Sequence, residues 1–257
     1  MQKDTIKHII AVASGKGGVG KSTVAVNLAL ALLKEGVRVG LLDADIYGPS
    51  QPTMLGAQGE RPVLSGKQLQ PIERHGLQSM SIGYLVDATA AMMWRGPMLG
   101  KALEQLLRDT AWGELDYLII DLPPGTGDVQ LSLCQKIPVS GAVIVTTPQD
   151  LALIDVRRAC EMFKKLNVPI LGVIENMSTH HCEQCGHEDK LFGEGGGETL
   201  STEYRTPLLG TIPLNRTIRE MTDGGMPPVA GAPESRYAVV FGEIAAKVAD
   251  QLTRNEK

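Results

Sequence analysis

Apolar residues occur along the chain in short runs, and most runs are followed by a longer stretch in which apolar residues recur at helical spacing. The runs are rich in Ile, Val and Leu, which predicts buried strands, and they lie at residues 9–13, 37–43, 117–121, 142–146, 170–175 and 208–212. The helical stretches lie at residues 22–35, 97–110, 151–166 and about 235–253. Strands that alternate with helices pair in parallel through right-handed crossovers. We therefore expect an α/β fold with a mostly parallel central sheet and helices on both faces.

Two stretches break this alternation. Residues 47–78 are rich in Gly, Pro and Gln, and we expect them to form an excursion with a small hairpin. An insert at about residues 176–199 is polar, contains the pair Cys182 and Cys185, and closes with a Gly-rich run at residues 193–197. The chain of 257 residues has the length of one large α/β domain. We expect a single domain over residues 1–257.

The first apolar run leads directly into a Gly-rich loop that opens the first helical stretch. Residues 15–22 read G-x-x-x-x-G-K-S, a pattern in which backbone N–H groups hold phosphate oxygens at the positive end of a helix. The Lys of this motif reaches the β- and γ-phosphates, and the Ser coordinates Mg²⁺. Because the chain lacks the N/T-K-x-D signature of guanine readers, we expect the loop to bind and hydrolyse ATP. The residues concerned are Gly15, Lys16, Gly17, Gly18, Val19, Gly20, Lys21, Ser22 and Thr23.

Carboxylates stand at the ends of two predicted strands. Asp43 and Asp45 end the second strand, and Asp121 ends the third. In open α/β sheets the carboxyl ends of parallel strands face the crevice where ligands bind. Asp121 suits a Walker-B role, in which it holds Mg²⁺ through water together with Ser22, and Asp45 suits the metal site and the orientation of the attacking water. Asp43 could serve the metal or cap the turn, and the sequence leaves both roles open.

Lys16 is an unusual residue for a phosphate loop, because a second cation beside Lys21 is unfavourable unless a polyanion lies between them. A lysine that points into solvent is the alternative. The string K-G-G-V-G-K-S at residues 16–22 resembles the deviant Walker A loop of the SIMIBI-type P-loop NTPase superfamily, which includes MinD, ParA and the nitrogenase iron protein. The resemblance implies that Lys16 acts across a dimer interface on the partner's nucleotide, and that Lys16, Lys21 and Asp45 are catalytic. It also implies adenine contacts by Asn176 and Pro213, although Asn176 suits a turn as well.

Further strings cover nearly the whole chain: S-G-K-G-G-V-G-K-S-T (14–23), D-A-D-I-Y-G-P-S (43–50), D-L-P-P-G-T-G-D (121–128), E-N-M-S (175–178), C-x-x-C-G (182–186), F-G-E-G-G-G-E (192–198) and G-T-I-P-L (210–214). In these strings the chain resembles the Mrp/ApbC family of iron-sulfur cluster carrier ATPases. The resemblance implies a homodimer, a [4Fe-4S] cluster bridged between subunits by Cys182 and Cys185, and partners that are cluster-assembly scaffolds and recipient apoproteins. Two features depart from the family. Many bacterial members have an extra N-terminal domain before the first strand, whereas here the first predicted strand begins within ten residues of the start of the sequence. In addition, His180 and His181 stand where the family usually has aromatic or apolar residues.

The cysteine pair on its own allows more than one chemistry. Two thiolates cannot complete a four-coordinate site, and a twofold axis would bring two pairs together as Cys₄ for Zn²⁺ or an iron-sulfur cluster. A monomeric zinc site would add His187 or His181 instead. A thioredoxin-like redox pair requires C-x-x-C at the start of a helix, and the pair lies in a polar, Gly-rich insert. Cys134 and Cys160 fall on helical segments, and we expect them to be small core residues.

Composition narrows the range of partners and functions. The net charge of -4 and the aromatic content of 4% disfavour nucleic acid as the main partner. No apolar run approaches the length of a membrane span, and four cysteines in a chain of this size favour the reducing cytoplasm. We expect a cytoplasmic, ATP-dependent iron-sulfur cluster carrier. The alternatives are a ParA/MinD-like positioning ATPase, a zinc-binding P-loop ATPase, and a reductase like the nitrogenase iron protein, which would use widely spaced single cysteines.

Overall fold

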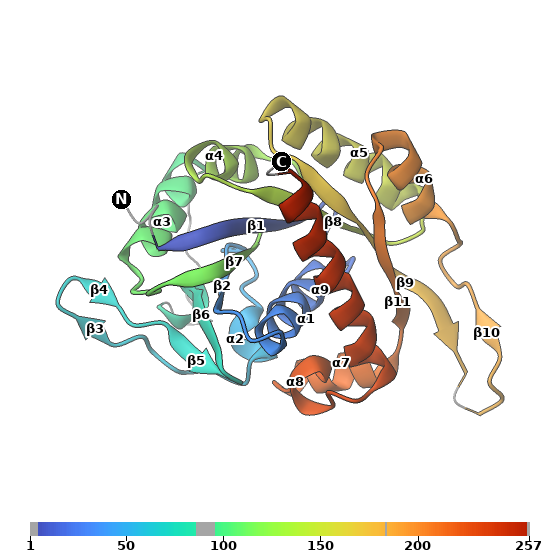
Figure 1. Cartoon of the computed structure of the whole chain (residues 1–257), viewed down its shortest axis with the longest axis horizontal. Coiled ribbons are helices and arrows are strands. Elements are labelled where there is room, and N and C mark those ends of the chain that lie inside the picture. Colours follow the sequence, from blue (N-terminus) through green and yellow to red (C-terminus); the bar gives the residue numbers. More distant parts are fainter. Residues whose placement is uncertain (1–4, 86–95, 183, 256–257) are drawn as a thin grey trace.

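The computed structural model of the chain describes residues 5–85, 96–182 and 184–255. Within them, nine strands form one sheet and two more form a separate hairpin that projects from one end of the molecule (Figure 1). The order in the sheet is β5, β6, β2, β7, β1, β8, β9 and β10, and β11 also pairs with β9. Their bounds are β1 (Ile6–Ser14), β2 (Val39–Asp43), β5 (Ile72–Arg74), β6 (Leu77–Ser81), β7 (Leu115–Asp121), β8 (Gly141–Thr146), β9 (Ile170–His181), β10 (Glu188–Asp189) and β11 (Leu208–Leu214). The separate hairpin consists of β3 (Leu64–Ser65) and β4 (Gln68–Leu69).

The centre of the sheet is parallel. Strands β6, β2, β7, β1, β8, β9 and β11 pair in parallel, whereas β5 and β10 pair antiparallel to β6 and β9. Helices cover both faces, so the carboxyl-terminal halves of β1 and β7 are buried, and every residue of β8 is buried. The expected fold class is confirmed.

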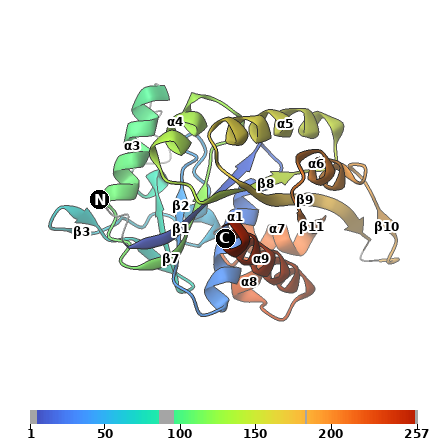
Figure 2. The ribbon, with the colours of Figure 1, turned by 45° about the horizontal axis from the view of Figure 1, so that its top comes forward.

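The helices form one layer on each side of the sheet (Figure 2), with α1, α8 and α9 below it and α3 to α6 above it. They are α1 (Lys21–Lys34), α2 (Gln51–Met54), α3 (Gly96–Asp109), α4 (Asp128–Lys136), α5 (Asp150–Lys165), α6 (Gly196–Tyr204), α7 (Arg216–Asp223), α8 (Pro228–Gly231) and α9 (Arg236–Asn255), with a 3₁₀ turn at Ile82–Tyr84. The four expected helices are confirmed as α1, α3, α5 and α9. No helix of the described residues is long and apolar enough to cross a bilayer.

Two segments differ from the expectation. Strand β9 continues to His181 instead of ending at residue 175, so the insert expected from about residue 176 begins too early. Backbone pairing explains the extension, because Asn176 is opposite Ile212 of β11 and His181 is opposite Glu188 of β10. The excursion at residues 47–78 contains the expected hairpin, but it also leads into β6, which joins the main sheet beside β2.

Candidate functional site

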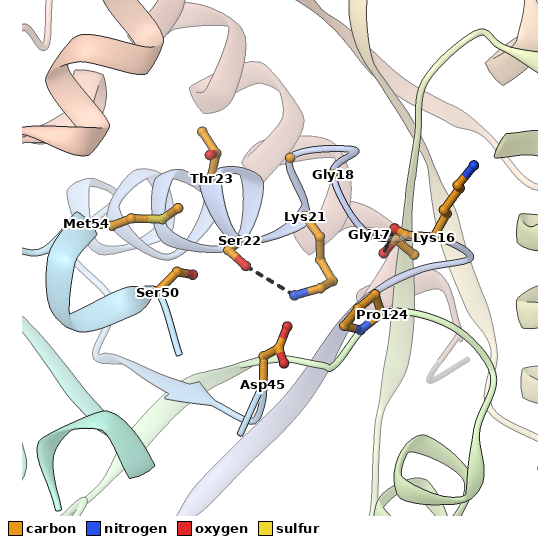
Figure 3. A pocket seen from close by; sticks show the side chains of 12 residues that line it. Lys16, Gly17, Gly18, Lys21, Ser22, Thr23, Asp45, Ser50, Met54 and Pro124 are labelled. Atoms are coloured by element: carbon orange, nitrogen blue, oxygen red, sulfur yellow. Dashed lines mark hydrogen bonds between the residues drawn. The ribbon is translucent and has the colours of Figure 1, made fainter. Parts of the chain in front are cut away.

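The loop between β1 and α1 is shaped to receive phosphate. Gly20 ends it with a φ of 81°, a backbone conformation that favours glycine, and within the described residues no side chain caps the helix that follows. The first N–H groups of α1 therefore remain available to an anion. The loop borders a cavity of about 190 Å³ (Figure 3), to which these predicted residues contribute: Lys16, Gly17, Gly18, Gly20, Lys21, Ser22 and Thr23.

The two other predicted loop residues lie behind this cavity. Val19 is buried, with 4% of its surface exposed. Gly15 packs against the backbone of α5, and a Cβ at this position would lie 2.2 Å from the carbonyl carbon of Asp155. The start of the loop is thus held against α5, and its later residues face the cavity.

Lys21 is held by a carboxylate beneath the loop. Its Nζ lies 2.5 Å from Asp121 Oδ1 and 3.2 Å from the hydroxyl of Ser22. The side chains of Lys21 and Asp121 are 6% and 0% exposed. A polyphosphate that enters the cavity must compete with Asp121 for this ammonium group.

Asp43 lies next to Asp121 and anchors the segment that follows β2. The two residues are register partners on β2 and β7. Asp43 accepts hydrogen bonds from the Asp45 N–H at 3.1 Å, the Gln51 N–H at 3.2 Å and the Ser81 hydroxyl at 3.1 Å. Burial, and secondarily the charge of Asp121, raise the pKa of Asp43 to about 7. The sequence left open whether Asp43 serves the metal or caps the turn, and these hydrogen bonds show that it caps the turn.

Asp45 and Lys16 lie on opposite sides of the cavity, and their side chains point in different directions. The Asp45 carboxylate points toward Lys21, whereas the Lys16 side chain points away from it (Figure 3). Burial raises the pKa of Asp45 from its ordinary value. Lys16 is exposed.

Two residues that the sequence did not single out lie at the site: Ser50 lines the cavity, and Gln51 is buried outside that lining and contacts Asp121. Gln51 is fully buried, and its Nε2 donates to Asp121 Oδ2 at 2.8 Å. Within the described residues, Gln51 Oε1 and the hydroxyl oxygen of Ser50 are buried without a hydrogen-bond partner. The hydroxyl oxygens of Ser22 and Ser50 and the carboxylates of Asp45 and Asp121 make a set of oxygen atoms, which is the donor type that Mg²⁺ prefers. The residues present therefore fit a magnesium-bound nucleotide.

The residues expected near adenine lie on the other side of the loop. Asn176 is 7% exposed, and its Nδ2 donates to the carbonyl of Val19 at 2.8 Å. Because Asn176 pairs with Ile212, Pro213 lies beside it on β11. The alternative that Asn176 forms a turn is wrong, since the residue lies within β9. Contact of either residue with adenine remains a prediction.

The cysteine pair lies where β9 turns back into β10, at the edge of the molecule in Figure 1. The Cys182 N–H donates to the His187 carbonyl at 2.9 Å, and the Gly186 N–H donates to the Cys182 carbonyl at 2.8 Å. Cys182 is half-buried and Cys185 is exposed. The described residues around the pair form no helix, so the arrangement that a thioredoxin-like pair requires is absent from this part of the chain.

The other two cysteines have no access to this hairpin connection. Cys134 and Cys160 are buried, and burial raises the pKa of each thiol to about 12. Their expected place in the core is confirmed. Among the described residues, no group of three or more His, Cys, Asp or Glu side chains lies close enough together to hold a metal ion.

Comparison with known proteins identifies the family. The model of the ParA group described as "NUBPL iron-transfer P-loop NTPase" matches residues 5–249. The chain belongs to this NUBPL-type family. An "Iron-sulfur cluster carrier protein" of Escherichia coli K12 is 58% identical over 96% of the chain and 67% of its own length. The "Iron-sulfur cluster transfer protein NUBPL" of Mus musculus is 49% identical over 96% of the chain and 78% of its own length.

Solved structures agree with this NUBPL-type assignment. A nucleotide-binding protein from Archaeoglobus fulgidus in complex with ADP has a TM-score of 0.79 and 38% identity, with 91% of each chain covered. The cell division ATPase MinD from Pyrococcus furiosus has a TM-score of 0.72 and 25% identity, with 95% of this chain and 98% of that one covered. The NUBPL-type chain is therefore a P-loop ATPase, and the resemblances to carrier ATPases and to MinD and ParA are confirmed.

Proposed function

We propose that this protein is an ATP-dependent iron-sulfur cluster carrier, which receives a [4Fe-4S] cluster from assembly scaffolds in the cytoplasm and transfers it to apoproteins. The observation that carries the proposal is the thiol pair at the β9–β10 connection, in a chain of the NUBPL-type family. Cys185 is exposed there, so a recipient protein can reach the cargo directly. The names of the Escherichia coli and Mus musculus relatives support the same activity.

The ligand count supports a homodimer with the cluster at its interface. A cluster needs four ligands, and the described residues of one chain place no third His, Cys, Asp or Glu with Cys182 and Cys185. A second copy related by a twofold axis would supply the other two thiolates. Each chain would then supply two of the four thiolate ligands, so opening of the dimer would release the cluster.

The face around the phosphate loop also suits a second copy. Lys16 extends away from its own cavity (Figure 3). Helix α5 packs against Gly15 and exposes two large apolar side chains, Leu151 at 67% and Ile154 at 47%. Apolar side chains that remain exposed beside an outward-pointing cation are suited to a protein contact. Lys16 would reach the nucleotide of the partner subunit across this face.

The roles within the nucleotide site follow from the positions of the side chains. The N–H groups at the start of α1 would hold phosphate oxygens, and Lys21 would leave Asp121 to neutralise them. Magnesium, when bound, supplies positive charge on the phosphates, and Ser22, Asp45 and Asp121 would hold it. Asp45 would also orient the attacking water. Asn176 and Pro213, on the other side of the loop, would contact adenine.

Anaerobic reconstitution tests the proposal. The protein, incubated with iron, sulfide and a reductant, should contain about four iron and four sulfide per dimer, as one shared cluster requires. On mixing with an apo-ferredoxin, the cluster should appear on the ferredoxin, as measured by circular dichroism. Binding of one Zn²⁺ per monomer without dimerisation, or a cluster that does not transfer, would contradict the proposal.

Lys16→Ala is expected to stop hydrolysis while ATP affinity stays close to that of the wild type, because Lys16 would act on the partner's nucleotide. Mixing this variant with Lys21→Ala should restore activity, although each variant alone is inactive. Random pairing makes half of the dimers mixed, and each mixed dimer has one complete site, so about a quarter of wild-type activity is expected. Phosphate release measures the recovery. If subunits exchange and no activity returns, Lys16 does not act in trans.

A further inference from the structure

Gln51 is a buried amide where three elements of the nucleotide site meet. It is the first residue of α2 and is fully buried. Its Nε2 donates both to Asp121 Oδ2 at 2.8 Å and to the carbonyl oxygen of Ser22 at 3.1 Å. Its backbone N–H donates to Asp43 Oδ2 at 3.2 Å. One residue therefore joins the ends of β2 and β7 to the phosphate loop.

Asp121 divides its two oxygens between a cation and this amide. Oδ1 accepts from the ammonium group of Lys21 at 2.5 Å, and Oδ2 accepts from Gln51. When a nucleotide draws Lys21 to its phosphates, Gln51 is the side-chain donor that stays on Asp121 among the described residues. The amide is neutral. It can orient the carboxylate without adding a charge that would repel a divalent cation.

The neighbouring carboxylate makes such support necessary. Asp43 and Asp121 are opposite each other on β2 and β7, and both are fully buried. The negative charges of two carboxylates on neighbouring strands repel each other, and burial strengthens the repulsion. Gln51 donates to one carboxylate through its side chain and to the other through its backbone, so it fixes both at their present spacing.

Two side-chain oxygen atoms of the segment at Ser50 and Gln51 receive no hydrogen bond from the described residues. Gln51 Oε1 and Ser50 Oγ are buried and lack a hydrogen-bond partner among the described residues. Buried polar atoms of this kind are uncommon in folded proteins and call for an explanation. Ser50 lines the phosphate cavity, and its hydroxyl faces it (Figure 3). A water molecule carried by a divalent cation in this cavity would supply the donor that Ser50 lacks.

We propose that Gln51 is a positioning residue for magnesium-dependent nucleotide binding, which holds the Asp121 carboxylate between the phosphate loop and Asp43 once Lys21 has turned to the nucleotide. The role presupposes the magnesium-nucleotide site proposed above and does not depend on the iron-sulfur cargo. Gln51 acts through Asp121 and need not touch the nucleotide.

The test measures the affinity of the full-length chain, without cluster, for a fluorescent ADP analogue in EDTA and in Mg²⁺. In the wild type, Mg²⁺ should tighten binding. Gln51→Met keeps the length of the side chain and removes the amide, so the tightening by Mg²⁺ should fall by about tenfold, the effect of losing a hydrogen bond to a charged group. Affinity in EDTA should stay within about twofold of the wild type, because the loop N–H groups and Lys21 are retained. Gln51→Glu, of equal size, should lose the tightening as well and provides a second test if the Met variant does not fold.

Gln130→Met is the matched control. Gln130 is equally buried, and its amide donates to the Pro123 carbonyl and not to a carboxylate. This variant should keep the full effect of Mg²⁺. Equal weakening in EDTA and in Mg²⁺ for Gln51→Met, or a loss as large in Gln130→Met, would overturn the positioning role. Absence of any Mg²⁺ effect in the wild type would instead overturn the proposed magnesium site, so the two failures are distinguishable.

Discussion

Replacing Lys21 with Ala is expected to stop ATP hydrolysis and to destabilise the protein at the same time. The ammonium group is the charge that the loop offers to the β- and γ-phosphates, and loss of one such donor costs on the order of 10²–10³-fold in rate. In the structure the same group also pairs with Asp121, where both side chains are almost completely buried. Removal of one partner of a buried ion pair costs about 3–5 kcal/mol. Phosphate release and urea unfolding measure the two effects separately.

A double variant separates the contributions of Lys21 to catalysis and to stability. Lys21→Ala combined with Asp121→Asn removes the unpaired buried charge, so it should regain much of the lost stability and remain inactive. Lys34→Ala, an exposed lysine at the end of the same helix, should change neither property. Normal hydrolysis by Lys21→Ala would refute the phosphate site. Equal stability of the single and double variants would show that the loss of stability does not come from the unpaired charge of Asp121.

Replacing either Cys182 or Cys185 with Ala should abolish cluster binding. In the proposed arrangement four thiolates hold one cluster across the dimer, and either substitution removes two of them because each subunit carries the change. The broad absorbance near ~400 nm of the reconstituted protein should therefore be lost in both variants. ATP binding should survive, since the nucleotide contacts lie on other loops. Absorbance, iron content and nucleotide affinity are measured on the same samples.

Cys160→Ala is the control for these variants. The thiol of Cys160 is fully buried in α5, so its loss should leave the absorbance and the iron content unchanged. Zinc content is measured in parallel. If the cluster persists in Cys182→Ala, or if zinc binding requires His187 or His181 in a monomer, the bridging arrangement is wrong.

The sequence predicted those elements whose signal is local. The phosphate loop follows from its glycines and its lysine, and the central strands follow from apolar runs that both faces of the sheet bury. Strand β9 was predicted too short because its last residues are polar and their order comes from pairing with β11 and β10. Strand β6 was missed for a similar reason, since its sequence L-Q-S-M-S contains no apolar run and its order comes from pairing with β2. Pairing between distant segments has no local sequence signature.

The same distinction applies to the site. Asp45, Asp121 and the cysteine pair could be proposed as site residues from the sequence, because they follow predicted strands or match a ligand spacing. Gln51 could not, since it stands in a stretch rich in Gly, Pro and Gln, and only the fold brings it to Asp121. The ion pair between Lys21 and Asp121 could not be predicted from the sequence either, because the loop motif specifies only the contact of its lysine with phosphate.

The length of β9 connects the phosphate loop mechanically to the cysteine pair. Its neighbour β8 pairs with it only as far as Glu175. The next residue, Asn176, donates a hydrogen bond to Val19 of the phosphate loop. The strand then continues to His181, directly before the cysteine pair. Beyond β8 this segment keeps its pairing with β11 and β10, and at about 3.3 Å per residue it extends roughly 16 Å from a pivot at Asn176. A tilt of about 10° at its pivot would move the tip by roughly 3 Å, more than the ~2.3 Å length of a bond between zinc and a thiolate. A small displacement of the loop would thus be magnified at the thiols, where it would be enough to open or close the proposed shared cluster site.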